Sequence, residues 1–352
     1  MTWLAWRQFR AQAAVALGAL VLVAIVLLLT GPHLVHLYDT TVANCSGHGD
    51  CSAATSALIT DGDKVGAGLR VVVEVVPALI GLFWGAPLVA RELETGTYRL
   101  AWTQVTRTRW MTVKIGLLGL ASMVFAGVLS LMVTWWSSPL DRVNMNIFGT
   151  FDQRDIVPVG YAAFSFALGV TAGVLIRRTL PAMATTLAVF VAARTTFSQF
   201  LRPQLMAPVL RHLALNPATT GYGSSGLLFF GAGPSTLEPS PPDTPNAWVI
   251  STQIVDKAGH ALSAQVLKTD CPLLGKGGLG PVGQHSSGPV PAAAAHTLHD
   301  CVVKIGATYH ELVTYQPASH YWALQWYELA IFLGAALILG GFCFWWVRNR
   351  LA

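Results

Sequence analysis

Charged side chains are scarce in this sequence, since aspartate, glutamate, lysine and arginine make up only 11% of its 352 residues while 53% are hydrophobic. A soluble domain typically carries about 25% charged residues. The deficit excludes an ordinary soluble protein. Amphipathic stripes are also missing. The apolar residues are instead gathered into continuous runs, and each run is close in length to the roughly 20 residues that a helix needs to cross a bilayer.

Six such runs are present. They are residues 12–30, 70–90, 114–136, 157–176, 180–199 and 321–347. Backbone amides in lipid must be bonded internally, which an open sheet cannot do, so each run is predicted to be a transmembrane helix. The fold class is therefore an all-α integral membrane protein with six transmembrane helices, five of them within 12–199, and a short tail at 348–352.

Arg7 and Arg10 precede the first run, as basic residues do in a secretory signal peptide. The run is long for a signal core and no small-x-small cleavage site follows it, so we favour a membrane anchor. With the aromatic residues Trp3 and Trp6, residues 1–11 are predicted to form a short amphipathic helix that lies in the membrane interface.

The basic residues are concentrated on one side of the predicted topology. Six spans place both termini on the same side, and the short segments of that side hold 11 of the 22 lysines and arginines. These segments are residues 1–11, 91–114, 177–178 and 348–352. The positive-inside rule places them, and hence both termini, on the cytoplasmic face of the plasma membrane.

Four of the five cysteines fall on the predicted outer face, Cys45 and Cys51 after the first span and Cys271 and Cys301 before the last. An even number of cysteines in an oxidising compartment predicts disulfides. Proximity favours the pairs Cys45–Cys51 and Cys271–Cys301. Two other connectivities and four free thiols remain open. The fifth cysteine, Cys343, lies within the last span.

Residues 200–320 are too many for a simple connection and are predicted to form a small extracellular domain of mixed structure between the fifth and sixth spans. Its start, through residue 212, is expected to form short helices on the membrane surface. Residues 248–255 and 302–305 have the β-branched content of strands. The glycine-rich and proline-rich stretches between them are typical of irregular chain.

The cytoplasmic loop at 91–114 is the most charged stretch, yet it keeps apolar side chains such as Leu93, Tyr98 and Trp102. A helix, a glycine break and a second short helix would present these side chains on a protrusion that docks in a groove of a partner. The alternative is a solvated turn that only carries positive-inside arginines.

The pattern Glu92-x-x-x-Gly96-Thr97 in this loop resembles the E-x-x-x-G-T signature of ATP-binding cassette transporter permeases of the type-2 (type V, ABCG-like) class. The run 91–109 is similar to actinobacterial members, and further similarity lies at 2–12 and 314–350. The resemblance implies an interfacial N-terminal helix, six spans, an outer domain and a coupling helix at 92–106 that sits in a cleft of the ATPase subunit. The residues proposed for that contact are Glu92, Glu94, Gly96, Thr97, Tyr98 and Arg99.

The sequence has no nucleotide-binding loop of the form G-x-x-x-x-G-K-[S/T], since Gly275-Lys276 is followed by Gly277. ATP and Mg²⁺ are therefore expected in a separate ATPase subunit, present in two copies. A second copy of this permease, or a related permease, would complete the assembly in the lipid bilayer. No cofactor in this chain and no nucleic-acid partner is expected.

Three ionisable side chains, Glu74, Arg194 and Glu328, lie inside the outer ends of predicted spans. A charge at the centre of a span costs about 2.5–3.5 kcal/mol on insertion scales, so each is a functional candidate. Their similar depths predict an ion-paired cluster with Arg194 between two carboxylates, acting as an outer gate. The alternative is that each side chain reaches the interface separately.

Spans two and five line the translocation path in the resembled family. Phe83, Trp84, Phe190 and Phe197 are therefore predicted to form walls for an apolar substrate. Lipid-facing positions and packing between helices are the competing interpretation for each of them.

Two enzyme-like patterns are incomplete. Residues 310–313 read His-Glu-Leu-Val, but Thr314 stands where a zinc protease has its second histidine. Residues 223–226 have the wrong spacing for a serine nucleophile elbow. The chain by itself is expected to have no catalytic site and no metal.

The predicted function is the permease subunit of an exporter for a hydrophobic or amphiphilic substrate, such as a drug, a lipid or a peptide. The alternative is a membrane-bound sensor or assembly factor whose extracellular domain binds a ligand or partner.

Overall fold

The computed structural model describes residues 2–42, 52–96, 106–144, 146–214, 246–263, 265–266, 269, 300–301 and 303–350. The chain divides into two compact units, one made of Met1–Met206 with Ser319–Ala352 and one made of Ala207–Ala318. Each unit is described by itself.

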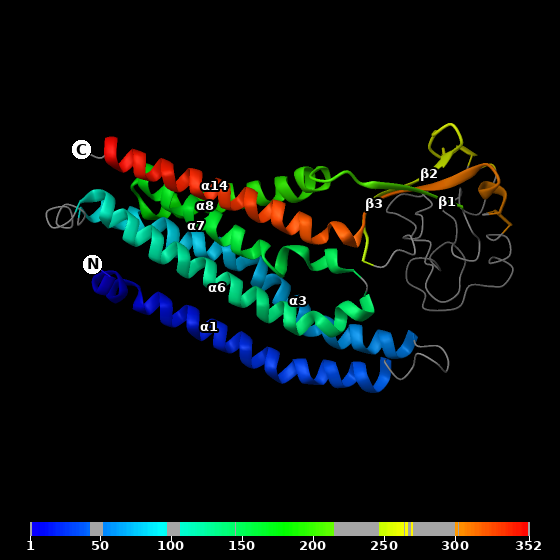
Figure 1. The fold of residues 1–352 in the computed structure, drawn as a ribbon, viewed down its shortest axis with the longest axis horizontal. Helices are drawn as coiled ribbons and strands as arrows, with labels where there is room; N and C mark the ends of the chain where they lie inside the picture. The colour runs from blue at the N-terminus through cyan, green and yellow to red at the C-terminus, as the bar shows by residue number, and fades with distance from the viewer. Residues whose placement is uncertain are drawn as a thin grey trace. The chain divides into compact units, whose positions relative to one another are not determined.

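The first unit is a bundle of long apolar helices (Figure 1). The α-helices are α1 (Thr2–Leu37), α3 (Ser52–Ile80), α4 (Ala86–Thr95), α6 (Arg107–Asn144), α7 (Val157–Ile176), α8 (Thr179–Thr196) and α14 (Tyr321–Asn349). The short π and 3-10 segments are η1 (Tyr38–Val42), η2 (Gly81–Gly85), η3 (Ile147–Gln153), η4 (Phe197–Leu201), η5 (Arg202–Gln204) and η6 (Ala318–His320).

Six helical stretches of the described chain are long and apolar enough to cross a membrane, which confirms the predicted fold class. They run further than the hydropathy pattern alone indicated, because η2 joins α3 to α4 and because η4 and η5 extend α8 to Gln204. One prediction is corrected. The helix expected at 1–11 is not a separate element, since α1 is continuous from Thr2 to Leu37.

α7 is the centre of this bundle. It contacts α3, α4, α6, α8 and α14, and most of its 20 residues are buried. A helix that is apolar on all sides is expected in an interior, and α7 has that character.

Four glycines bring the second span directly onto α7. A Cβ added at Gly169 of α7 would lie 2.4 Å from the carbonyl oxygen of Gly81, and one added at Gly173 would lie 2.6 Å from the carbonyl oxygen of Ala86. Gly85 is equally restricted, with the Phe166 carbonyl oxygen at 2.6 Å. Small residues spaced four apart let two helix backbones approach this closely in a membrane protein. The second span adopts its π-helical turn, η2, at the same place.

The second unit contains a three-stranded antiparallel sheet. Its strands are β1 (Val209–Ala214), β2 (Trp248–Asp256) and β3 (Tyr309–Gln316), in the order β1-β3-β2. β3 is therefore the central strand, and its residues Glu311, Val313 and Tyr315 are buried on one face.

Two local predictions for this segment are wrong. Residues 200–204 form short helical turns as predicted, but residues 209–212 belong to strand β1 rather than a surface helix, because β1 pairs with β3 from Val209↔Tyr315 to Ala214↔His310. Residues 303–306 are helical rather than extended. β3 is not predicted from the sequence because Glu311 occupies one of its buried positions. Hydrophobic and polar residues therefore do not alternate regularly along it.

Candidate functional site

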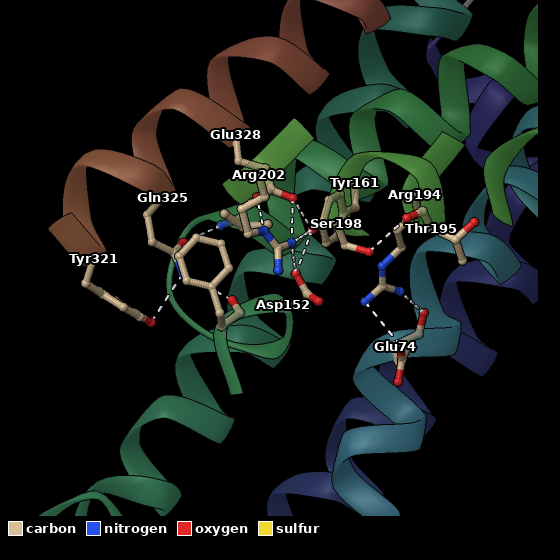
Figure 2. A network of polar contacts seen from close by, with 12 residues as sticks. Glu74, Asp152, Tyr161, Arg194, Thr195, Ser198, Arg202, Tyr321, Gln325 and Glu328 are labelled. Carbon is tan, nitrogen blue, oxygen red and sulfur yellow. Dashed lines mark hydrogen bonds and ion pairs between the residues drawn. The ribbon is translucent and has the colours of Figure 1, made fainter. Parts of the chain in front are cut away.

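A buried arginine joins three elements at one end of the helical bundle (Figure 2). Arg202 of η5 donates from Nε to Oε2 of Glu328 at 2.8 Å and from Nη2 to Oε1 of the same carboxylate at 2.9 Å. Its Nη2 also pairs with Asp152 of η3. A two-pronged arginine–carboxylate contact is both strong and directional. Glu328 lies on α14 and is 0% exposed, so this contact fixes α14 against the end of α8.

Tyr161 of α7 closes the network. Its hydroxyl donates to Asp152 Oδ1 at 2.9 Å, contacts Oε1 of Glu328, and lies 3.1 Å from Nη2 of Arg202. Each buried charge thus has a partner of opposite charge and a hydrogen bond to a neutral group, as burial of a charge requires. We call Asp152, Tyr161, Arg202 and Glu328 the ionic network.

The same face of α14 carries two further contacts to η3 and its flanks. Gln325 accepts from the Val157 backbone N–H at 3.1 Å and donates to the Phe151 carbonyl at 3.1 Å. Tyr321 donates to Asp155. Positions spaced by four and by three residues share a face of a helix, so residues 321, 325 and 328 form one polar stripe in an otherwise apolar span.

Arg194 of α8 forms a second ion pair beside the network. Its Nη2 lies 3.5 Å from Oε1 of Glu74 on α3, and its Nη1 donates to the Glu74 carbonyl oxygen at 2.9 Å. The guanidinium also lies over the Tyr161 ring, 4.8 Å from its centroid.

The predicted pairing is therefore correct for one carboxylate and wrong for the other. Arg194 contacts Glu74, but Glu328 pairs with Arg202 instead, and Tyr161 lies between the two arginines. Arg202 and Asp152 are not predicted as site residues because both lie outside the apolar runs. Hydropathy assigns their segments to the loops between spans. The polar stripe on the last span was the signal that could have indicated a buried partner.

The aromatic residues proposed as path walls have different surroundings. Phe190 and Phe197 are 2% and 6% exposed and pack inside the bundle, on Phe164 and Phe332. This corrects their assignment as walls, because a core side chain offers no surface to a substrate. Trp84 is partly buried against Phe125. Phe83 is 51% exposed and remains a candidate.

The acidic residues at the start of the proposed coupling segment contact other spans. Glu92 of α4 pairs with Lys114 of α6, which is buried and lies 4.7 Å from the centroid of the Trp110 ring. Glu94 accepts from the backbone N–H and the hydroxyl of Thr179 at 3.0 and 2.7 Å. Thr179 is the first residue of α8, where unpaired N–H groups favour a carboxylate.

Helix α4 ends where the signature places its glycine. Gly96 has φ of 74°, the left-handed conformation that commonly terminates a helix. Thr97, Tyr98 and Arg99 lie outside the described residues, as does the chain through residue 105. The coupling helix at 92–106 therefore stays a prediction beyond Gly96.

Of the outer cysteines only Cys301 is among the described residues. It is 8% exposed and disulfide-bonded. Cys45, Cys51 and Cys271 lie outside the described residues, so both pairings remain predictions. Cys343 of α14 is a free thiol, buried beside the Thr171 hydroxyl at 3.2 Å.

Comparison with known proteins places this architecture in a family. Residues 17–202, just over half of the chain, match the family described as ABC-2 membrane transporter related. The chain belongs to that family. The match confirms the resemblance to an ABC-2 type permease and establishes a multi-pass membrane component of a transporter. No curated protein and no solved structure matches the chain.

The region matched to the ABC-2 family extends from α1 to Arg202. It therefore includes three members of the ionic network, Asp152, Tyr161 and Arg202, together with the pair of Glu74 and Arg194. Glu328 and the second unit follow it in the chain.

Proposed function

We propose that this chain is the permease of an ATP-driven exporter, coupled to a separate ATP-binding cassette ATPase that supplies ATP and Mg²⁺ chemistry. A pair of ATPases requires two permeases, so a second copy or a related chain completes the transporter. Membership of the ABC-2 family supports this proposal, as do the six apolar helices.

The observation that carries the proposal is the path from the signature loop to the pair of Glu74 and Arg194. α3, η2 and α4 form one uninterrupted span from Ala57 to Thr95. The loop leaves from its last turn, and Glu74 lies roughly 30 Å away along the same helical axis at 1.5 Å per residue. A displacement of the loop by an ATPase would therefore act directly on Glu74.

The cytoplasmic end of this span and its middle both contact α8. Glu94 binds Thr179 at the start of α8, and Glu74 binds Arg194 near its end. In the proposed cycle, ATP binding moves the loop, the second span shifts along α8, and the contact of Glu74 with Arg194 loosens. The ionic network holds α14 closed until that happens and acts as an outer gate.

The orientation proposed here places the loop and both termini in the cytoplasm. Its support is the concentration of lysine and arginine in the short segments on that side. The ionic network and the second unit are then extracellular or in the outer leaflet, and the pairings of Cys45 with Cys51 and of Cys271 with Cys301 are formed in an oxidising compartment.

The substrate proposed for export is hydrophobic or amphiphilic. Apolar side chains dominate the exposed faces of the second and fifth spans, among them Val71, Val75 and Leu79 on α3 and Leu187 and Val191 on α8. Phe83, also exposed, extends this surface.

Purification of this chain from its native membrane, with detection of any ATP-binding cassette ATPase that accompanies it, tests the proposal. Substitution of Tyr98 and Arg99 by alanine should leave the permease folded but abolish both association and permease-dependent ATP hydrolysis. Lys64→Gln, an exposed residue near the opposite end of the second span, is the matched control and should leave both intact. Capture of an outer-surface partner with no ATPase would contradict the proposal and favour a sensor or assembly factor.

A further inference from the structure

A cleft in the helical unit is lined by none of the four residues of the ionic network. Its volume is about 360 Å³, within the range of about 300–1,000 Å³ that small-molecule sites occupy. Its walls come from α3, α6 and the segment around η3. The large apolar residues of its lining are Ile59, Leu69, Val133, Trp136 and Leu140.

Two ion pairs border this apolar floor. Arg70 donates from Nη2 to Asp63 Oδ1 at 2.7 Å, both on α3. Arg154 donates from Nη1 to both oxygens of Asp141 at 2.7 Å. The four residues all line the cleft, which therefore has two cationic and two anionic groups and no net charge.

The two pairs differ in how readily they exchange partners. The side chains of Arg70 and Asp63 are 45% and 58% exposed, whereas those of Arg154 and Asp141 are 11% and 22% exposed. An exposed ion pair contributes only about 0–1 kcal/mol. A ligand that offers an anion to Arg70 and a cation to Asp63 can therefore replace this pair at little cost.

Glycine keeps the cleft open. A Cβ at Gly66 would meet the Trp136 ring at 3.7 Å and Arg70 Nη2 at 3.9 Å, which is ordinary contact, so any longer side chain would extend into the cleft. On the same helix, Gly68 is exposed and has nothing within 4 Å of its Cβ position.

We propose that this cleft binds a zwitterionic phospholipid, whose phosphate contacts Arg70 and whose ammonium contacts Asp63 while its glycerol and upper acyl chains cover Leu69 and Trp136. Arginine matches phosphate geometry, and a carboxylate matches an ammonium group. Lipid reaches this site directly, since its lining residues belong to the ends of membrane-spanning helices. An anionic lipid such as phosphatidylglycerol would offer Arg70 the same phosphate but give Asp63 no cation.

The cleft is adjacent to the ionic network through η3. Thr150 and Gln153 line the cleft, while Asp152, from the same short helix, pairs with Arg202. Bound lipid would therefore restrain the turn that carries Asp152. This makes the site a position where membrane composition acts on the network.

Native mass spectrometry of the full chain in detergent tests the proposal. It measures the binding of phosphatidylethanolamine, phosphatidylglycerol and diacylglycerol that have identical acyl chains. Phosphatidylethanolamine should bind at one site about tenfold more tightly than the other two lipids. Gly66→Leu should weaken that binding about tenfold, whereas Gly68→Leu should leave it unchanged. Asp63→Asn should remove the preference over phosphatidylglycerol, and Arg70→Gln should weaken both phospholipids.

Equal binding of the three lipids, or equal losses in Gly66→Leu and Gly68→Leu, would show non-specific annular lipid and overturn the proposal. The proposal would also be overturned if soluble glycerophosphoethanolamine displaced phosphatidylethanolamine at an equal concentration. The apolar residues of the cleft would then contribute nothing to binding. Arg70→Gln and Asp63→Asn alter exposed side chains, so they decide the matter even if Gly66→Leu fails to fold.

Discussion

Arg202 and Glu328 are 126 positions apart in the chain and form the most enclosed ion pair of the described residues, with Nε to Oε2 at 2.8 Å and side-chain exposures of 8% and 1%. The pair connects the last helix to the end of α8. Arg202 is the charged partner of Glu328, so loss of Arg202 leaves Glu328 uncompensated, whereas loss of Glu328 leaves Arg202 paired with Asp152.

Arg202→Met should therefore lower the stability of the helical unit by about 3–5 kcal/mol, the usual cost of breaking a buried pair. Glu328→Leu should cost less, because Arg202 keeps its ion pair with Asp152. The double variant should be more stable than Arg202→Met, since apolar side chains of similar volume can replace both charges. Thermal unfolding in detergent measures this, and a double variant no more stable than Arg202→Met would contradict the pairing.

Substitutions of Glu92 and Lys114 distinguish two possible roles of Glu92. It either holds the end of α4 against α6 or contacts the ATPase directly. Lys114→Met and Glu92→Leu should reduce permease-dependent ATP hydrolysis to similar degrees, because each leaves a part-buried charge without its partner. The double variant should recover activity if Glu92 acts through α6. If Glu92 instead contacts the ATPase, Lys114→Met alone should be nearly silent and the double variant should resemble Glu92→Leu.

The glycine contact of the second span with α7 predicts a strong steric effect. Gly169→Ala places a methyl group 2.4 Å from a backbone oxygen that cannot turn away, so a loss of about 1–3 kcal/mol or more is expected. Gly116→Ala on α6 is the control, because nothing lies within 4 Å of its Cβ position. There the change should be neutral or stabilising by about 0.5–1 kcal/mol. Equal melting temperatures for the two variants would contradict the close approach.

The sheet of the second unit should lose stability as the pH rises. Burial raises the pKa of Glu311 from 4.5 to about 7, and its cross-strand partners, Leu213 and Ile254, are apolar. A carboxyl with a raised pKa in the folded state favours folding fully below pH 4.5, and this contribution declines between about pH 4.5 and 7. Hydrogen exchange of β3 amides across that range should show faster opening at higher pH.

Glu311→Gln is the matched control for that experiment, since it keeps the shape and cannot ionise. Its exchange rates, corrected for intrinsic chemistry, should not change between pH 4.5 and 7. Unchanged protection in the parent chain would mean that the carboxyl is already solvated.

The sequence predicts where the membrane-spanning helices lie, but it does not predict which side chains pair between them. Hydropathy identified every span because lipid imposes a length and a composition on each helix separately. It could not assign Glu328 to Arg202, since pairing depends on how far α8 continues beyond its apolar run and on the turn that carries Asp152. The G-x-x-x-G segments at 81–85 and 169–173 are visible in the sequence, and their close contacts fix how the second span sits on α7.

The strands were harder because the second unit has no lipid constraint. β1 has mostly exposed residues and gave no alternation, and β3 buries a carboxyl where an apolar residue was expected. In both strands the decisive interaction is pairing with a distant segment, which no local pattern records.

Five neighbouring helices surround α7, and this enclosure limits which parts of the molecule can change position during a transport cycle. A shift of α7 would disturb its contacts with all five helices at once. We therefore expect α7, the fourth span, to stay in place while other helices move around it. Pairs of spectroscopic labels should report a change in distance when one label is on α8 or α14 and the other is at an end of α7.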